Sequence, residues 1–139
     1  MRVSAKAEYA CLAILALARQ SPEAPPLRIR EISETYEIPE RYLVQILLQL
    51  KGAGLVVSTR GAAGGYRLAR SAENVRLSEV LSAIDGPDSI RAEGNGSSRQ
   101  ATRVLASVWA TVRAAERAVL EGTTIANLVE RTSPREWTI

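Results

Sequence analysis

A stretch near the middle of the chain, STRGAAGGYRLAR (58–70), places an arginine immediately before a turn rich in glycine. The glycines allow the backbone to turn tightly and to adopt positive φ, which predicts the tip of a β-hairpin. An arginine beside a tip without bulky side chains suits the narrow, electronegative minor groove of DNA. The DNA contacts expected here come from Arg60, Gly61, Gly64 and Arg67, with Arg70 as a further phosphate contact. Taken alone, an ordinary surface turn explains these residues equally well.

A second group of residues lies on a segment with helical periodicity, 39–51. Its apolar residues follow the i, i+3, i+4, i+7 spacing of a buried helix face. On the opposite face, Arg41 can bind guanine or a phosphate and Gln45 can pair with adenine, while Val44 suits a thymine methyl group. Tyr42 flanks this face and can donate to a phosphate. The alternatives are that the polar residues only solvate the helix, and that Val44 and Leu48 pack on a neighbouring helix.

The residue types needed for covalent chemistry are scarce. The chain contains no histidine and one cysteine, Cys11, and no paired carboxylates lie on adjoining elements. Histidine-based catalysis and histidine metal ligation are therefore excluded, and we expect neither an enzyme nor a metal site. A single cysteine also excludes an internal disulfide and fits the reducing cytoplasm. Within its apolar segment, Cys11 is interpreted as a small buried side chain, with a redox switch as the alternative.

The positive charge is concentrated in the first half of the chain. Residues 1–70 hold ten Lys or Arg against six Asp or Glu, whereas residues 71–139 hold eight against nine. This distribution favours an anionic partner for the first half. The apolar run near the N-terminus is about half as long as a bilayer-spanning helix, so we expect a buried helix and a cytoplasmic protein without membrane contact.

The elements that must position these residues follow from periodicity and turn signals. Two short strands flank the glycine-rich turn, and helices are expected at about 5–19, 29–36, 39–51, 77–84, 101–121 and 124–130. This order predicts a mainly α fold, a winged helix-turn-helix with a two-stranded β wing and a long C-terminal dimerisation helix. The expected organisation is a DNA-binding domain at 1–87, a mobile loop at 88–100, and a unit at 101–139 with the dimerisation helix, a short last helix and the tail.

The long helix carries a seam of apolar residues spaced as in a coiled coil. The seam consists of Leu105, Val108, Val112, Ala115 and Val119, and Trp109 widens it. A helix of this length spans about 30 Å, more than a small domain can cover. We expect it to pack against a second copy, which gives a homodimer and a palindromic operator. Packing on the first helix of the same chain is the alternative.

Four stretches of the chain resemble the Rrf2 family of bacterial transcriptional regulators. They are MRVSAKAEYA, YLVQIL, GLVVSTRGAAGGYRLAR and LSEVLSAIDGP, and the similarity continues through the long helix. The resemblance implies a homodimeric winged-helix repressor or activator of transcription. It also implies DNA contacts at Lys6, Tyr42, Gln45 and Arg60.

Two departures from the family's pattern refine this expectation. Family members commonly carry glutamate where this chain has Val44, so the resemblance does not carry the operator sequence of those members over to this chain. Iron–sulfur members carry three cysteines in the segment that here reads DSIRAEGNGSSRQ, which implies a regulator without a cluster or other cofactor. In this respect the chain is similar to the cysteine-metabolism repressors of the family, which implies control of sulfur metabolism.

The same branch implies cysteine synthase as a partner. The last residues, Trp137, Thr138 and Ile139, then form a docking tail whose carboxylate anchors in the enzyme, with a frayed tail as the alternative. We therefore expect a sequence-specific DNA-binding regulator, a repressor that binds double-stranded DNA as a homodimer. The alternative is a winged helix that acts only through a protein partner such as cysteine synthase. That alternative predicts no salt-sensitive affinity for DNA.

Overall fold

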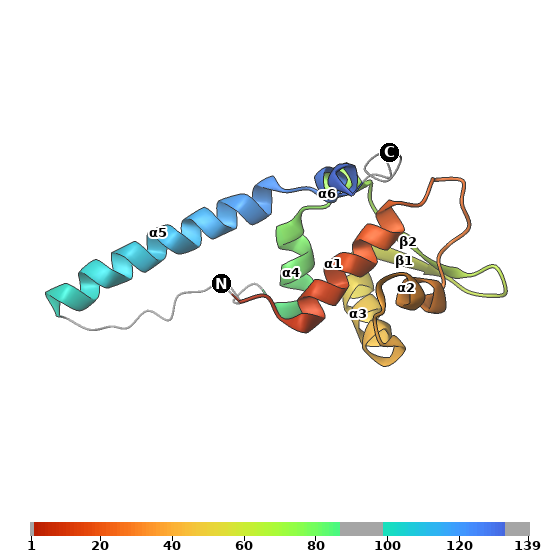
Figure 1. The fold of residues 1–139 in the computed structure, drawn as a ribbon, viewed down its shortest axis with the longest axis horizontal. Coiled ribbons are helices and arrows are strands. Elements are labelled where there is room, and N and C mark those ends of the chain that lie inside the picture. The colour runs from red at the N-terminus through yellow and green to blue at the C-terminus, as the bar shows by residue number, and fades with distance from the viewer. Residues whose placement is uncertain (1, 87–98, 133–139) are drawn as a thin grey trace, which may run out of the picture.

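The computed structural model describes residues 2–86 and 99–132 of the chain. Their elements are α1 (Ala5–Ala18), α2 (Ile29–Tyr36), α3 (Glu40–Gly52), β1 (Val56–Thr59), β2 (Gly65–Leu68), η1 (Ala72–Asn74), α4 (Leu77–Asp85), α5 (Gln100–Gly122) and α6 (Ile125–Arg131). The order confirms the predicted winged helix-turn-helix with its two-stranded wing and long C-terminal helix (Figure 1). Most of the predicted loop 88–100 and the predicted docking tail lie outside the described residues.

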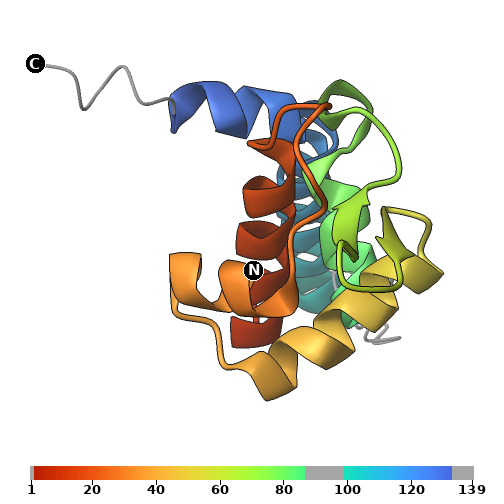
Figure 2. The same ribbon diagram turned by 90° about the vertical axis from the view of Figure 1, so that its right-hand side faces the viewer.

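Helix α1 is the centre of the core. The Ser4 hydroxyl accepts a hydrogen bond from the Ala7 amide at 3.0 Å and so caps its first turn. Ala7, Ala10 and Ala13 have no exposed surface, and their small side chains allow neighbouring helices to approach closely. Helices α2, α3, α4 and α6 all contact α1. Figure 2 shows α6 across the end of α1 opposite the one that α3 crosses.

The turn between α2 and α3 fixes the angle of the second helix of the motif. Glu37 adopts the left-handed conformation, with φ of 53°, and ends α2. The chain then folds back, because the Ile38 amide donates to the Ser33 carbonyl and the Ser33 hydroxyl donates to the Ile38 carbonyl at 2.6 Å. The face of α3 predicted to be buried has no exposed surface at Leu43, Ile46, Leu47 and Leu50.

The wing is attached to the chain that joins α1 to α2. Strands β1 and β2 pair antiparallel, with Val56 opposite Leu68 and Thr59 opposite Gly65. Leu27 pairs in turn with Tyr66, through a 2.7 Å and a 3.1 Å main-chain hydrogen bond, a contact that the sequence did not predict. A Cβ on Gly65 would lie 2.5 Å from the Leu27 carbonyl oxygen, so glycine is required at this close approach.

The last two helices have different surroundings. Helix α5 projects away from the other helices (Figure 1), and its buried residue is Leu120, near its C-terminal end. Helix α6 returns to the core, where Ile125 is fully buried and its amide donates to the Val75 carbonyl at 2.9 Å. The Thr124 hydroxyl accepts a hydrogen bond from the Asn127 amide at 3.1 Å and so caps α6. None of the helices in the described ranges combines the length and apolarity needed to cross a bilayer.

Candidate nucleic-acid interface

The outward face of α3 is open to solvent. Tyr42, Val44 and Leu48 are 42%, 43% and 60% exposed, and Arg41 and Gln45 are exposed beside them. The alternative that Val44 and Leu48 pack on a neighbouring helix is therefore wrong within the described part of the chain. The Arg41 guanidinium lies 4.9 Å from the centre of the Tyr42 ring and donates to its hydroxyl at 3.3 Å. The face thus presents a pre-positioned cation, an amide and two aliphatic side chains.

Three of the predicted DNA contacts line one hollow. Lys6 comes from the first turn of α1, and Tyr42 and Gln45 come from α3, around a hollow of about 430 Å³. The contact α1 makes with α3 brings these residues together although they are far apart in the sequence. A phosphate bound between Lys6 and the Tyr42 hydroxyl would hold the amide of Gln45 against the edge of a base.

Arg60 lies on the exposed tip of the wing. Gly61 has a φ of +103°, which only glycine adopts readily, and a Cβ on Gly64 would overlap the carbonyl oxygen of Thr59. These two glycines therefore set the path of the tip. The tip borders a second hollow, of about 490 Å³, which Arg28 and Arg30 of α2 also line. Sequence reasoning missed these two arginines, although their alternation in LRIRE at the start of a helix was a visible signal.

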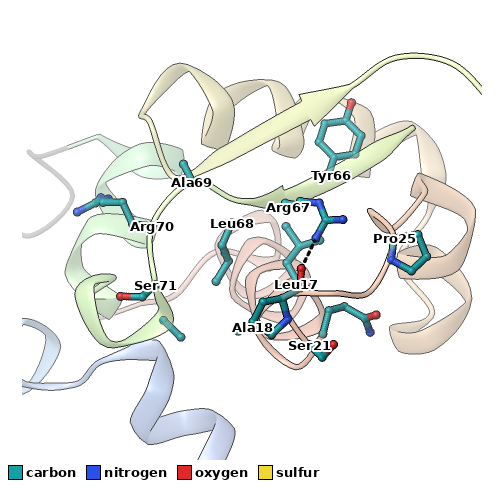
Figure 3. Close-up of a pocket in the computed structure, with 13 residues that line it drawn as sticks. Leu17, Ala18, Ser21, Pro25, Tyr66, Arg67, Leu68, Ala69, Arg70 and Ser71 are labelled. Atoms are coloured by element: carbon teal, nitrogen blue, oxygen red, sulfur yellow. Dashed lines mark hydrogen bonds between the residues drawn. The ribbon is translucent and has the colours of Figure 1, made fainter. Parts of the chain in front are cut away.

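Arg67 and Arg70 are engaged within the protein. Arg67 donates to the Ala24 carbonyl at 2.5 Å and to the Pro22 carbonyl at 3.4 Å. Figure 3 shows its guanidinium turned from β2 toward the chain that follows α1, across a pocket of about 490 Å³. Arg70 forms a 2.6 Å salt bridge with Glu79 and also donates to the Asn74 carbonyl. Binding of either arginine to a phosphate would require these bonds to break, so both fit a role in fixing the base of the wing.

The salt bridge of Arg70 shifts the titration of its partner. Partial burial acts to raise the pKa of the Glu79 carboxyl, but the hydrogen bonds from Arg70 and from the Arg76 amide outweigh it, with help from the charges of both arginines. The net effect is a lowered pKa for Glu79. The carboxylate therefore stays ionised and holds the strand end against α4.

Cys11 is half-buried on α1, beside the cluster formed by Ala7, Leu81 and Leu120. Burial, together with the charge of Glu8, raises the pKa of the Cys11 thiol from 9.0 to about 11. Because the thiolate is the reactive and metal-binding form, this environment favours the interpretation of Cys11 as a small apolar side chain. Among the described residues, no three histidine, cysteine or acidic side chains gather where they could hold a metal ion.

The apolar seam of α5 is exposed. Leu105, Val108, Trp109, Val112 and Val119 expose between 45% and 66% of their surface, and Ala115 is exposed with them. The alternative that this seam packs on the first helix is wrong for the described residues, since α5 enters the core at Leu120 alone. A row of large apolar side chains in water is typical of surfaces that bind a partner.

Comparisons with known proteins agree with this geometry. Residues 3–131 match the profile of the family Rrf2, described as an iron-dependent transcriptional regulator. A protein of Mycobacterium tuberculosis named as a candidate HTH-type transcriptional regulator, Rv1287, is 40% identical over 131 residues, which are 92% of this chain and 81% of that one. The HTH-type transcriptional regulator IscR of Escherichia coli is 35% identical, over 93% of this chain and 80% of its own.

A solved structure is also similar over nearly the whole chain. The structure of CymR, the global cysteine regulator of B. subtilis, superposes with a TM-score of 0.85 and is 31% identical. The match covers 96% of this chain and 99% of that protein. The two relatives from M. tuberculosis and E. coli are named as transcriptional regulators, and CymR is named as a cysteine regulator.

Proposed function

The chain belongs to the Rrf2 family of transcriptional regulators, and from that premise we propose that it is a homodimeric repressor that binds a palindromic DNA site. Helix α3 of each protomer lies in the major groove, and Arg60 of each wing reaches the adjacent minor groove. The observation that carries the proposal is the open outward face of α3, where Arg41, Val44 and Gln45 are exposed while the opposite face is fully buried.

The side chains of this face suit direct readout of bases. The Gln45 amide matches the donor and acceptor of adenine, the Arg41 guanidinium matches guanine, and Val44 fits beside a thymine methyl group. The hollow that Lys6, Tyr42 and Gln45 share supports a phosphate contact next to the base contact. Arg60 adds a contact that depends on groove width rather than on base edges.

The homodimer is supported by the exposed seam of α5. Two copies of this helix packed along their seams would cover the apolar side chains from Leu105 to Val119. A two-fold dimer also places two copies of α3 on one side of the assembly, where each can reach a half-site of the palindrome. The wing and α3 lie away from α5, so dimerisation leaves them accessible (Figure 1).

The signal we propose belongs to sulfur metabolism, on the strength of the similarity to CymR. An iron-dependent signal, which the family's description implies, does not fit the residues of this chain. With one cysteine and no histidine, the chain lacks the set of thiolate or imidazole ligands that an iron–sulfur cluster requires. We therefore propose regulation without an iron–sulfur cluster, and cysteine synthase as the partner of the tail stays a prediction.

The proposal is tested by selecting bound duplexes from a random DNA library and measuring the affinity for the selected site. We expect a palindrome and an affinity that falls steeply as salt rises, because arginine–phosphate contacts release counterions. Arg60→Ala should lower the affinity mostly for sites with a narrow minor groove, and Arg131→Ala, on α6, is the control. A protein that selects no sequence and shows no salt-sensitive affinity would be a protein-binding winged helix instead.

A further inference from the structure

Three arginines surround the hollow between α2 and the wing. Arg28 and Arg30 come from the start of α2, and Arg60 comes from the wing, around a space of about 490 Å³. The remaining lining residues are Ile29, Ser58, Thr59 and Tyr66 together with glycines of the wing tip, which carry no side chains. The pairing of Leu27 with Tyr66 fixes the distance between the two elements, because it joins the start of α2 to β2.

The positive charge in this hollow is not neutralised by the protein. Within residues 2–86 and 99–132, the guanidinium groups of Arg28, Arg30 and Arg60 make no hydrogen bond or salt bridge, whereas Arg67 and Arg70 nearby are both engaged. Glu31, on the same helix, accepts a hydrogen bond from the Arg28 amide at 3.2 Å. Three cations without partners around one opening repel one another, and an anion seated between them removes this repulsion.

We propose that Arg28 and Arg30 bind a backbone phosphate of DNA beside the minor groove that Arg60 enters. This inference rests on the proposed function and adds a sequence-independent contact on the α2 side of the wing. Phosphates line both edges of the minor groove, so a duplex that admits Arg60 brings one edge against α2. Arginine is suited to that position because its planar group donates two parallel hydrogen bonds to phosphate oxygens.

This phosphate contact fixes how deeply, and at what angle, the wing enters the minor groove. Arg60 alone could approach the groove from several directions, because its tip is exposed and its glycines carry no side chains. A phosphate held between Arg28 and Arg30 restricts the duplex to one approach, in which Arg60 meets the groove while α3 meets the base edges. Phosphate contacts of this kind set register and orientation without reading sequence.

The test is the salt dependence of binding by Arg28→Ala/Arg30→Ala on two duplexes, the selected operator and an unrelated sequence. We expect weaker binding to both duplexes in the same proportion. We also expect the slope of log affinity against log salt to fall by about 0.9 for each lost phosphate contact. When salt rises from 50 to 200 mM, the affinity should therefore fall by a factor about 3.5 times smaller for each phosphate contact that is lost. Arg131→Ala, an exposed arginine at the end of α6, should leave the slope unchanged.

Two further arms locate the phosphate. Arg28→Lys/Arg30→Lys should retain most of the affinity, because lysine also binds phosphate. A duplex in which neutral methylphosphonates replace phosphates at the edge of the minor groove should bind the wild-type protein more weakly. The same replacement should not change the affinity of Arg28→Ala/Arg30→Ala. The inference would be overturned if the alanine variant had the wild-type slope of log affinity against log salt. It would also be overturned if the methylphosphonate duplex weakened binding of both proteins equally. An altered preference between the duplexes would also overturn it, since a backbone contact reads no sequence.

The outcomes separate this inference from the function on which it rests. If the alanine variant binds like the wild type while Arg60→Ala binds weakly, the phosphate contact is wrong and the regulator remains. If the wild-type protein has no salt-sensitive affinity for any duplex, both are wrong. A rise in melting temperature with inorganic phosphate alone, lost in the alanine variant, would assign the hollow to a free anion and overturn the assignment to DNA.

Discussion

Replacing Trp109 by alanine should weaken self-association while leaving the fold intact. Trp109 is 53% exposed on α5 and lies beside Val108 and Val112, which are 48% and 45% exposed. No element of the described chain covers this part of the helix, so the core does not depend on its ring. In the proposed dimer the ring is instead buried against the second copy of α5.

The expected loss follows from the area of the ring. A tryptophan buries up to about 250 Å², so the exposed half is about 130 Å² and its burial contributes about 3 kcal/mol per copy at ~25 cal/mol per Å². A two-fold contact contains two copies, but interface area converts to affinity incompletely. A net loss of about 2 to 3 kcal/mol raises the dimer dissociation constant roughly 30- to 150-fold.

Sedimentation equilibrium over a range of concentrations measures this constant. The wild-type chain should sediment at twice the monomer mass of 15.0 kDa, and the variant should shift to the monomer mass as it is diluted. Leu48→Ala is the matched control, because Leu48 is equally apolar and 60% exposed but lies on α3. A Trp109→Ala variant with the wild-type dissociation constant, or a wild-type mass of 15.0 kDa at every concentration, would refute the reasoning.

Three other predictions concern the core and its titratable groups. Ile125→Ala should lower the free energy of unfolding by about 2 to 5 kcal/mol in urea titrations, because Ile125 is fully buried, whereas Leu48→Ala should change it by less than about 0.5 kcal/mol. Cys11 should react with iodoacetamide at pH 8 about a hundred-fold more slowly in the folded protein than in urea, because its pKa rises from 9.0 to about 11, and equal rates would contradict that burial. Because folding lowers the pKa of Glu79, its carboxylate stabilises the folded protein at pH values above the unfolded pKa. This stabilisation is lost as pH falls through the folded pKa. Glu79→Gln should therefore destabilise the protein at pH 7 by less than about 1 kcal/mol and by less still at pH 3, and an equal effect at both values would show that the Arg70 salt bridge does not contribute.

The α-helices and the two strands were predictable because they carry local signals, whereas the short helix η1 was not predicted. The apolar spacing from Leu43 to Leu50 matches the helical repeat, and the same residues are fully buried. The glycines of the wing tip mark a turn that other residues cannot adopt, and the φ of Gly61 and the crowding at Gly64 show why. Gly122 ends α5 and Thr124 caps α6, and glycine and threonine at such positions are signals that a sequence displays directly.

The features that the sequence missed are contacts between distant segments. Leu27 pairs with Tyr66 through main-chain atoms alone, and a pairing of one residue has no periodicity to detect. Arg67 looks the same in the sequence as Arg60, but its guanidinium bonds to carbonyls more than forty residues away. The pairing of Leu27 with Tyr66 holds α2 beside the wing, and for this reason Arg28 and Arg30 line the same hollow as Arg60.

A hydroxyl-radical footprint on the selected operator tests the central claim most directly. Two protomers, each with α3 in a major groove and Arg60 in a minor groove, should protect two symmetric half-sites separated by whole helical turns of about 10.5 base pairs. Arg60→Ala should lose the protection of the minor-groove sugars and keep the rest. Protection of a single half-site, or the same minor-groove protection with and without Arg60, would contradict the account.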